Sequence, residues 1–249
     1  MRAIIASSVA IIVLATGARR ASAQATGWND RIRVSINVGG QLTSTTFTTA
    51  TTKSVYIETA TINTSYTVPK DRLFDSGILF RLSGNFGVGA ALSSFAKLQD
   101  ASITGSIPHP FFFNTPRTIN GTASAQRVER VVHIQAAYVI ASKRWDLAIA
   151  GGPSIFDVNQ DLVTDVTFTD VYPYDTAGFG AATITKASAT KLGFNVSADF
   201  GVRLSKGIGV GGLVRFSRAT VDFPPTGPTS GVSTDAGGLQ AAGGVRFYF

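Results

Sequence analysis

Apolar and polar residues alternate with a period of two along eight segments of this chain, and this feature limits the possible folds more than any other. In residues 31–38, for example, Ile and Val at the even positions alternate with Arg, Ser and Asn at the odd positions. Successive side chains of a β-strand point to opposite faces, so each segment is predicted to be a strand with one apolar and one polar face. The eight segments are residues 31–38, 77–82, 86–93, 132–140, 147–155, 194–203, 208–217 and 239–249.

The connections between these segments alternate between short and long. Three are short, at 83–85, 141–144 and 205–207, and contain turn-forming or charged residues. The other four are long, at 41–72, 98–126, 159–188 and 221–235. The alternation predicts strands that run up and down, with the long loops at one end and both chain termini at the other. We therefore predict one all-β domain, an eight-stranded antiparallel up-and-down barrel, over residues 24–249.

The composition of the two faces indicates that the barrel crosses a membrane. Charged residues make up only 15% of the chain, below the roughly 25% of soluble domains. A soluble barrel turns its apolar face inward, and a secreted soluble sandwich is the weaker alternative. Here the polar face combines charges with many glycines, which suits a narrow lumen, while bulky Ile, Val and Phe suit lipid. The sequence thus predicts a transmembrane β-barrel with an inward-facing network of Arg33, Asp75, Arg81, Glu129, His133, Asp199, Arg203, Arg215 and Arg246.

Two further expectations follow from this polarity. Asp199, Arg215 and Asp75 are expected to belong to one interior network of ion pairs. Aromatic residues near the strand ends are expected to face lipid at the two membrane interfaces. Toward the long loops, these are Phe74, Phe95, Phe156, Phe194 and Phe216.

Residues 1–23 have the features of a cleaved signal peptide. A basic start precedes an apolar stretch that is shorter than the about 20 residues of a membrane helix, and Ala21-Ser22-Ala23 resembles a cleavage site. The stretch has no polar stripe, which argues against an amphipathic helix. The formal net charge is +7, but three of these charges lie in the leader and the remaining basic residues are scattered. Nucleic acid is therefore not expected as a partner.

The C-terminal residues connect the chain to a known group of proteins. Phe249, with Phe247 and Val245 at alternate positions before it, resembles the C-terminal signature of bacterial outer-membrane barrels. With the leader and the strand count, the sequence resembles the small eight-stranded OmpA/OmpX-like proteins. The resemblance implies location in the bacterial outer membrane, contact with its lipid, and recognition of Val245, Phe247 and Phe249 by the barrel-assembly machinery.

Few residues offer catalytic or metal chemistry. The chain has no Cys and two His, so neither a cofactor nor a metal site is predicted. His133 and Glu129 share one strand face, but four residues along a strand span about 13 Å, too far for a hydrogen bond. We predict a non-enzymatic structural or interaction anchor. The alternatives are a lipid-modifying barrel enzyme and a narrow channel for small apolar solutes.

The long loops are the predicted functional surface. Residues 43–67 hold 11 threonines, which favour strands, so the first two strands are expected to project past the membrane as a ribbon. The next loops carry aromatic residues, namely Phe111, Phe112, Phe113, Tyr172 and Tyr174. One interpretation is that these rings pack together and cap the barrel mouth. The other is that they bind a surface, a lipid or an extracellular protein.

Overall fold

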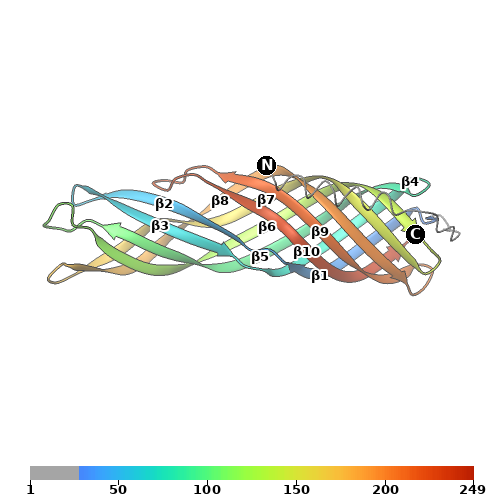
Figure 1. Ribbon diagram of the computed structural model, residues 1–249, viewed down its shortest axis with the longest axis horizontal. Coiled ribbons are helices and arrows are strands. Elements are labelled where there is room, and N and C mark those ends of the chain that lie inside the picture. The colour runs from blue at the N-terminus through green and yellow to red at the C-terminus, as the bar shows by residue number, and fades with distance from the viewer. Residues whose placement is uncertain (1–27) are drawn as a thin grey trace, which may run out of the picture.

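The computed structural model describes residues 28–249, so the predicted signal peptide lies outside the described residues. No helix within residues 28–249 is long and apolar enough to cross a membrane. Ten strands make up the structure (Figure 1). They are β1 (Ile32–Gln41), β2 (Thr45–Val55), β3 (Glu58–Val68), β4 (Asp71–Ser83), β5 (Phe86–Ile107), β6 (Arg117–Ala141), β7 (Trp145–Val171), β8 (Thr176–Arg203), β9 (Ile208–Phe223) and β10 (Val232–Tyr248).

Eight of these strands form a closed antiparallel ring, which confirms the predicted fold. The ring runs β1–β4–β5–β6–β7–β8–β9–β10 and closes through pairing of β10 with β1. The remaining two strands form the β2–β3 hairpin, and β3 pairs with β5 beyond the end of β4. The Thr-rich segment is therefore a ribbon, as expected, although it is a separate hairpin rather than an extension of the ring strands.

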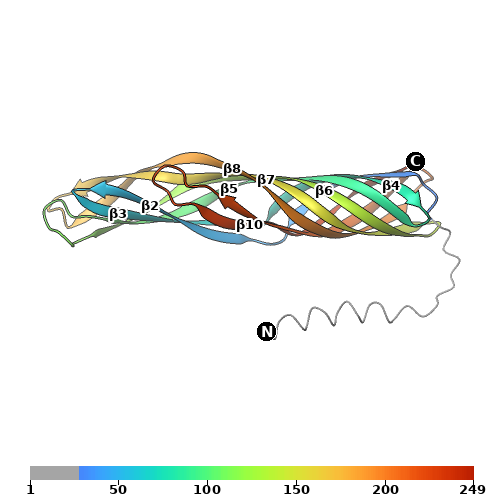
Figure 2. The same ribbon diagram turned by 90° about the horizontal axis from the view of Figure 1, so that it is seen from above.

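The long connections differ from the prediction. Residues 98–107 and 117–126 are strand rather than loop, as are residues 159–171 and 176–188. In β5 beyond residue 98 the alternation continues, with Ser and Thr in place of the bulky residues on the outer face. About 9–11 residues suffice to cross a bilayer in a tilted strand, whereas β7 has 27. Figure 2 shows the consequence, a long tube in which β2, β3 and the outer parts of β5 to β8 extend well past the ring.

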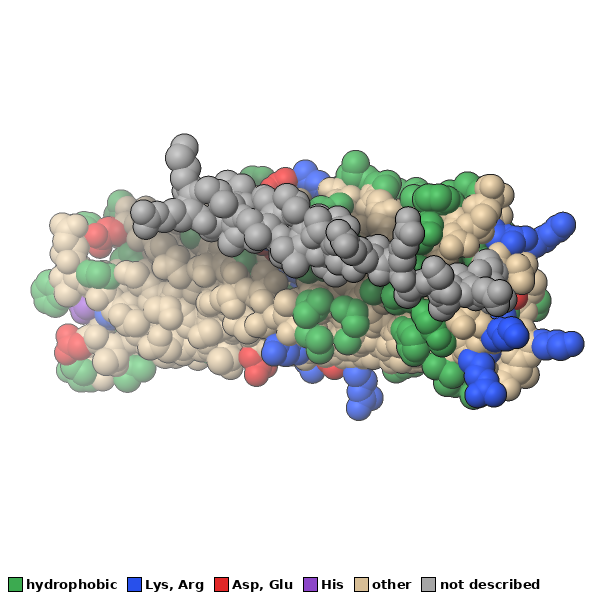
Figure 3. All heavy atoms as spheres, turned by 45° about the vertical axis from the view of Figure 1, so that its right-hand side comes forward, with side chains coloured by type: hydrophobic (Ala, Val, Ile, Leu, Met, Phe, Trp, Pro, Cys, Tyr) green, Lys and Arg blue, Asp and Glu red, His purple; other side chains and the backbone are tan. Residues whose placement is uncertain are grey.

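In the half of the barrel with the short turns, apolar side chains face outward. Figure 3 shows them as a belt over this half of the molecule, with Lys and Arg side chains beyond it at the end. Every ring strand contributes at least one such residue, with exposed fractions between 38% and 65%. Examples are Val38, Phe80, Leu92, Ile134, Ile149, Val196, Val214 and Val245. A closed barrel satisfies its own backbone hydrogen bonds, so this belt is a surface suited to hydrocarbon.

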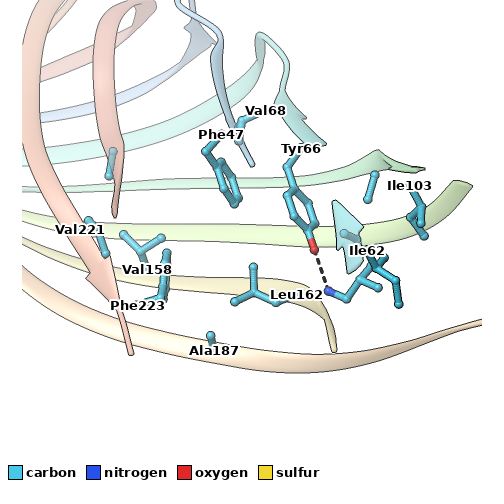
Figure 4. Close-up of a cluster of buried hydrophobic side chains, with 14 of the residues drawn as sticks. Phe47, Ile62, Tyr66, Val68, Ile103, Val158, Leu162, Ala187, Val221 and Phe223 are labelled. Carbon is cyan, nitrogen blue, oxygen red and sulfur yellow. Dashed lines mark hydrogen bonds between the residues drawn. The ribbon is translucent and has the colours of Figure 1, made fainter. Parts of the chain in front are cut away.

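In the outer half the polarity is reversed, with apolar side chains in the interior (Figure 4). Phe47, Ile62, Tyr66, Leu162 and Phe223 belong to this core, and the Tyr66 hydroxyl accepts the Val163 N–H at 2.7 Å. The expectation that Phe95 and Phe156 face lipid is wrong, since their exposed fractions are 2% and 0%. Beyond the membrane the outside of the tube is water, so the apolar residues there turn inward.

Candidate functional site

The lumen of the membrane half is filled by one chain of ion pairs and hydrogen bonds. It contains four Arg, four Asp and one Asn, so its formal charges cancel. In order of contact, the members are Asp30, Arg203, Asp146, Arg33, Asp199, Arg246, Asn37, Asp75 and Arg215. Buried charges are stable only when they are paired in this way. The chain crosses the lumen and leaves a cavity of about 40 Å³ beside Arg33, Asp75 and Arg215.

Asp75, Asp199 and Arg215 lie in this one network, although Asp199 and Arg215 do not touch. Asp75 pairs directly with Arg215 and accepts a 3.0 Å hydrogen bond from the amide of Asn37. Asn37 in turn accepts a 2.6 Å hydrogen bond from Arg246, which pairs with Asp199 at 2.9 Å. Sequence reasoning omitted Asp146, although this residue shares the inward face of β7 with Ala148.

The other predicted lumen residues lie outside this chain of contacts. Arg81 is half-buried and donates to the carbonyl of Trp28. Glu129 is buried, pairs with Arg127 at 2.7 Å and accepts the N–H of Gly237 at 3.0 Å. At the other end of the ring, Val245 and Phe249 are exposed. Their role in barrel assembly, like that of Phe247, stays a prediction.

His133 does not contact Glu129 but lies between two serines. Its Nε2 is 3.0 Å from the Ser93 hydroxyl, and its Nδ1 is 2.8 Å from the Ser154 hydroxyl. The amide of Asn195 also donates to Ser154 at 2.8 Å. A serine beside an imidazole is the arrangement of a nucleophile and its base. All three members of the trio are at most 4% exposed, so the trio is buried inside the barrel.

The outer end of the tube is formed by three segments that together make the candidate functional site. They are the β2–β3 turn, the loop of residues 108–116 between β5 and β6, and the β7–β8 turn of residues 172–175. The four non-glycine residues of the described chain with positive φ all lie here, namely Tyr56, Ile57, Asn114 and Tyr174. Such conformations cost free energy and are frequent at binding sites.

Arg117 and Asp170 hold the three segments together. The Arg117 side chain is 2% exposed, donates to the Pro108 carbonyl at 2.9 Å and pairs with Asp170 at 2.6 Å. The hydroxyl of Tyr56 donates to the same carboxylate at 2.5 Å. This hydrogen bond from Tyr56, together with Arg117, lowers the pKa of Asp170. The ionised carboxylate therefore links the β2–β3 turn, β6 and β7.

His109 fixes the loop that carries the three consecutive phenylalanines. Its ring is buried, and its Nδ1 accepts the N–H groups of Phe111 at 3.1 Å and Phe112 at 3.2 Å. The same ring packs on Phe112, with centroids 4.8 Å apart. The imidazole thus stabilises the turn of this loop rather than reaching into solvent.

The apolar side chains at this end remain exposed, and we call them the tip patch. The patch consists of Ile57 (91% exposed), Phe111 (68%), Phe112 (63%), Phe113 (70%) and Tyr172 (84%). Some rings touch, since Phe111 and Tyr174 lie 5.2 Å apart and Tyr172 and Tyr174 5.8 Å apart. Phe111 and Tyr172 thus each contact Tyr174, while all five side chains of the patch remain at least 63% exposed.

Protonation of Asp170 should loosen this end of the molecule. Because its pKa is lowered, the carboxylate stabilises the three segments above its ordinary pKa of 3.8, and this contribution is lost as the pH falls through the lowered value. Asp170→Asn should therefore raise amide hydrogen exchange in residues 108–116 roughly 2–5-fold at pH 7, the effect of losing a partly exposed ion pair. Asp175→Asn is the control, because Asp175 is exposed and makes no ion pair within the described residues. Equal exchange in both variants would contradict the linking role.

Comparison with known proteins adds the following. The sequence matches no protein-family model and no curated protein. Solved structures that align with the chain include the outer membrane protein OprG from Pseudomonas aeruginosa (9% identity, TM-score 0.47, covering 90% of this chain and 98% of that one). The outer membrane protease OmpT from Escherichia coli also aligns, with 8% identity and a TM-score of 0.47, covering 90% of this chain and 98% of that one. Ail, the attachment invasion locus protein of Yersinia pestis, aligns in its complex with the heparin analogue sucrose octasulfate. The identity is 11% and the TM-score 0.37, and the alignment covers 87% of this chain and 99% of that one.

The closed ring, the apolar belt and the paired charges inside it together make this chain an integral protein of the bacterial outer membrane. In outer-membrane barrels, short turns generally lie on the periplasmic side and long extensions lie outside the cell.

Proposed function

We propose that the protein is a non-catalytic anchor for surface attachment, and that the tip patch is its contact surface. The supporting observation is the exposure of five large apolar side chains in water at the end farthest from the membrane. Soluble surfaces rarely expose such groups together unless they contact a partner. The linked segments below the patch keep it ordered, so little conformational entropy is lost on contact.

The filled interior supports an anchor over the two alternatives. A channel for small apolar solutes requires a continuous bore, but the ion-pair chain and the apolar core occupy the tube one after the other. A lipid-modifying enzyme requires a nucleophile that meets lipid. The Ser93–His133 pair faces the lumen, and His133 has no exposed surface. The barrel wall and its contents therefore favour a rigid support.

This proposal predicts that attachment depends on the tip patch. Cells that produce the variant with Phe111, Phe112 and Phe113 all changed to Ser should adhere to polystyrene several-fold less than cells with the wild-type protein, because most of the exposed apolar area is removed. The measurement is the retained fraction of cells after washing. The shift in migration on SDS gels between unheated and boiled samples identifies the folded barrel, and the intensity of the folded band verifies equal amounts.

The matched control is Ile184→Ser, which removes a 39% exposed side chain from the wall of β8. This variant should adhere like the wild type. If the triple variant also adheres like the wild type, the tip patch is not the contact surface and the proposed function is wrong.

A further inference from the structure

The tip patch also indicates what kind of surface it contacts. Building on the proposed function, we propose that it inserts into the interface of a zwitterionic phosphatidylcholine bilayer that faces the bacterial cell. Three features of the outer end support this inference: its small area, its charge, and a hollow beside the aromatic rings.

The first feature is the size of the contact surface. A specific protein interface buries about 800 Å² on each partner and involves about 20–30 residues a side. The tip patch has five residues at the narrow end of a long tube. A lipid interface requires no matching shape, and Trp, Phe and Leu side chains of interfacial segments enter the boundary between headgroups and acyl chains. Phe111, Phe112 and Phe113 follow one another on one loop and are each at least 63% exposed, so they can enter such an interface together.

The second feature is charge. Residues 54–60, 108–116 and 171–177, which form the outer end, contain no Lys or Arg but contain Glu58 and Asp175. The nearest guanidinium, that of Arg117, is buried and paired with Asp170. Proteins that bind anionic membranes use clusters of basic residues. An acidic end would be repelled by an anionic membrane, so a zwitterionic surface is the compatible one.

The third feature is a hollow of about 270 Å³ beside the rings. It is lined by Tyr56, Ile57, His109 and the segment from Pro110 to Phe113. Aromatic walls attract quaternary ammonium groups through the negative faces of their rings. Glu58 follows Ile57 in the chain, and its carboxylate accepts the N–H of Asn114 at 3.0 Å next to the residues that line the hollow. These groups suit the trimethylammonium end of a phosphocholine headgroup.

The test measures co-sedimentation of the protein, held in amphipol, with sucrose-loaded vesicles. Vesicles of phosphatidylcholine should bind the wild-type protein at least about 10-fold more strongly than vesicles of phosphatidylglycerol. The triple Phe→Ser variant should lose at least about 10-fold in binding to phosphatidylcholine, because three aromatic side chains no longer leave water. Ile184→Ser should bind like the wild type. Both variants must retain the heat-modifiable migration of a folded barrel.

A second measurement reports insertion directly. In Phe112→Trp, the added fluorescence should be quenched by phosphatidylcholine brominated on its acyl chains, whereas Trp28 and Trp145 lie in the other half of the molecule. Equal binding to both vesicle types, or no quenching, would overturn the lipid proposal. If vesicles do not bind while attachment to polystyrene still requires the three phenylalanines, the proposed function stands and the partner is a protein rather than a bilayer.

Discussion

Arg215→Met alone should lower the free energy of unfolding of the barrel by about 3–5 kcal/mol, the usual cost of breaking a buried ion pair. Arg215 and Asp75 are both 2% exposed in their side chains and contact each other directly. Removing the guanidinium leaves the carboxylate buried in the lumen, where Asn37 is its remaining donor among the described residues. Asp75→Asn should be costly for the mirrored reason, since the guanidinium then has no anion.

The double variant separates this effect from a loss of packing. With both charges gone, Arg215→Met/Asp75→Asn should be more stable than the sum of the two single losses predicts, by about 2 kcal/mol or more. The measurement is urea unfolding of the protein folded in vesicles, followed by tryptophan fluorescence. Strictly additive losses would show that the two side chains are not coupled.

The chain supplies a matched surface pair as a control. Arg218 and Asp235 are 2.6 Å apart, but their side chains are 55% and 41% exposed. Water screens such a pair, so Arg218→Met should cost about 1 kcal/mol or less. Arg215 and Arg218 lie on opposite faces of β9. The difference between the effects of their substitutions measures how much burial in the lumen contributes to the free energy of unfolding.

The membrane half of the fold was predictable because its two environments differ so strongly. In a strand that crosses the membrane, one face meets lipid and the other meets the lumen. A charged side chain is costly on the lipid face, so Arg33 and Arg246 identify the inward face of their strands. The up-and-down order of the ring strands was predicted from the alternation of short and long connections. What sequence could not supply was the pairing, since Arg246 and Asn37 are 209 positions apart.

The outer half was less predictable because the apolar face of each strand points outward in the membrane half but inward in the outer half. Alternation fixes which residues share a face but not which face is wet. In β5, Leu92 faces lipid while Phe95, on the opposite face, is buried in the interior. The transition lies where the outward residues change from bulky apolar side chains to Ser and Thr, as in β5 beyond residue 98. The Phe111–Phe113 run was visible in the sequence, but the Arg117–Asp170 contact beneath it joins positions 53 apart.

The reversed polarity makes a second strong prediction, for Phe156. This side chain is fully buried in the outer core, with its ring 6.4 Å from that of His133. Phe156→Ala should cost about 3–5 kcal/mol of unfolding free energy, because the lost transfer energy is joined by a cavity that a closed tube cannot fill. Phe112→Ala, at a 63% exposed position, should stay within about 0.5 kcal/mol of the wild type. Urea unfolding in vesicles compares the two.

Fluorescence separates an inward Phe156 from one that faces lipid. Acyl chains would occupy the space left at a lipid-facing position, so such a site would lose only the transfer energy, about 1.5–3 kcal/mol. They would also quench a tryptophan placed there. We therefore expect Phe156→Trp to be unquenched by brominated lipid, while Phe194→Trp, at a 50% exposed position of the belt, is quenched. Quenching at position 156 would place the apolar core outside the tube, and the outer half would then have no interior to hold the tip patch in place.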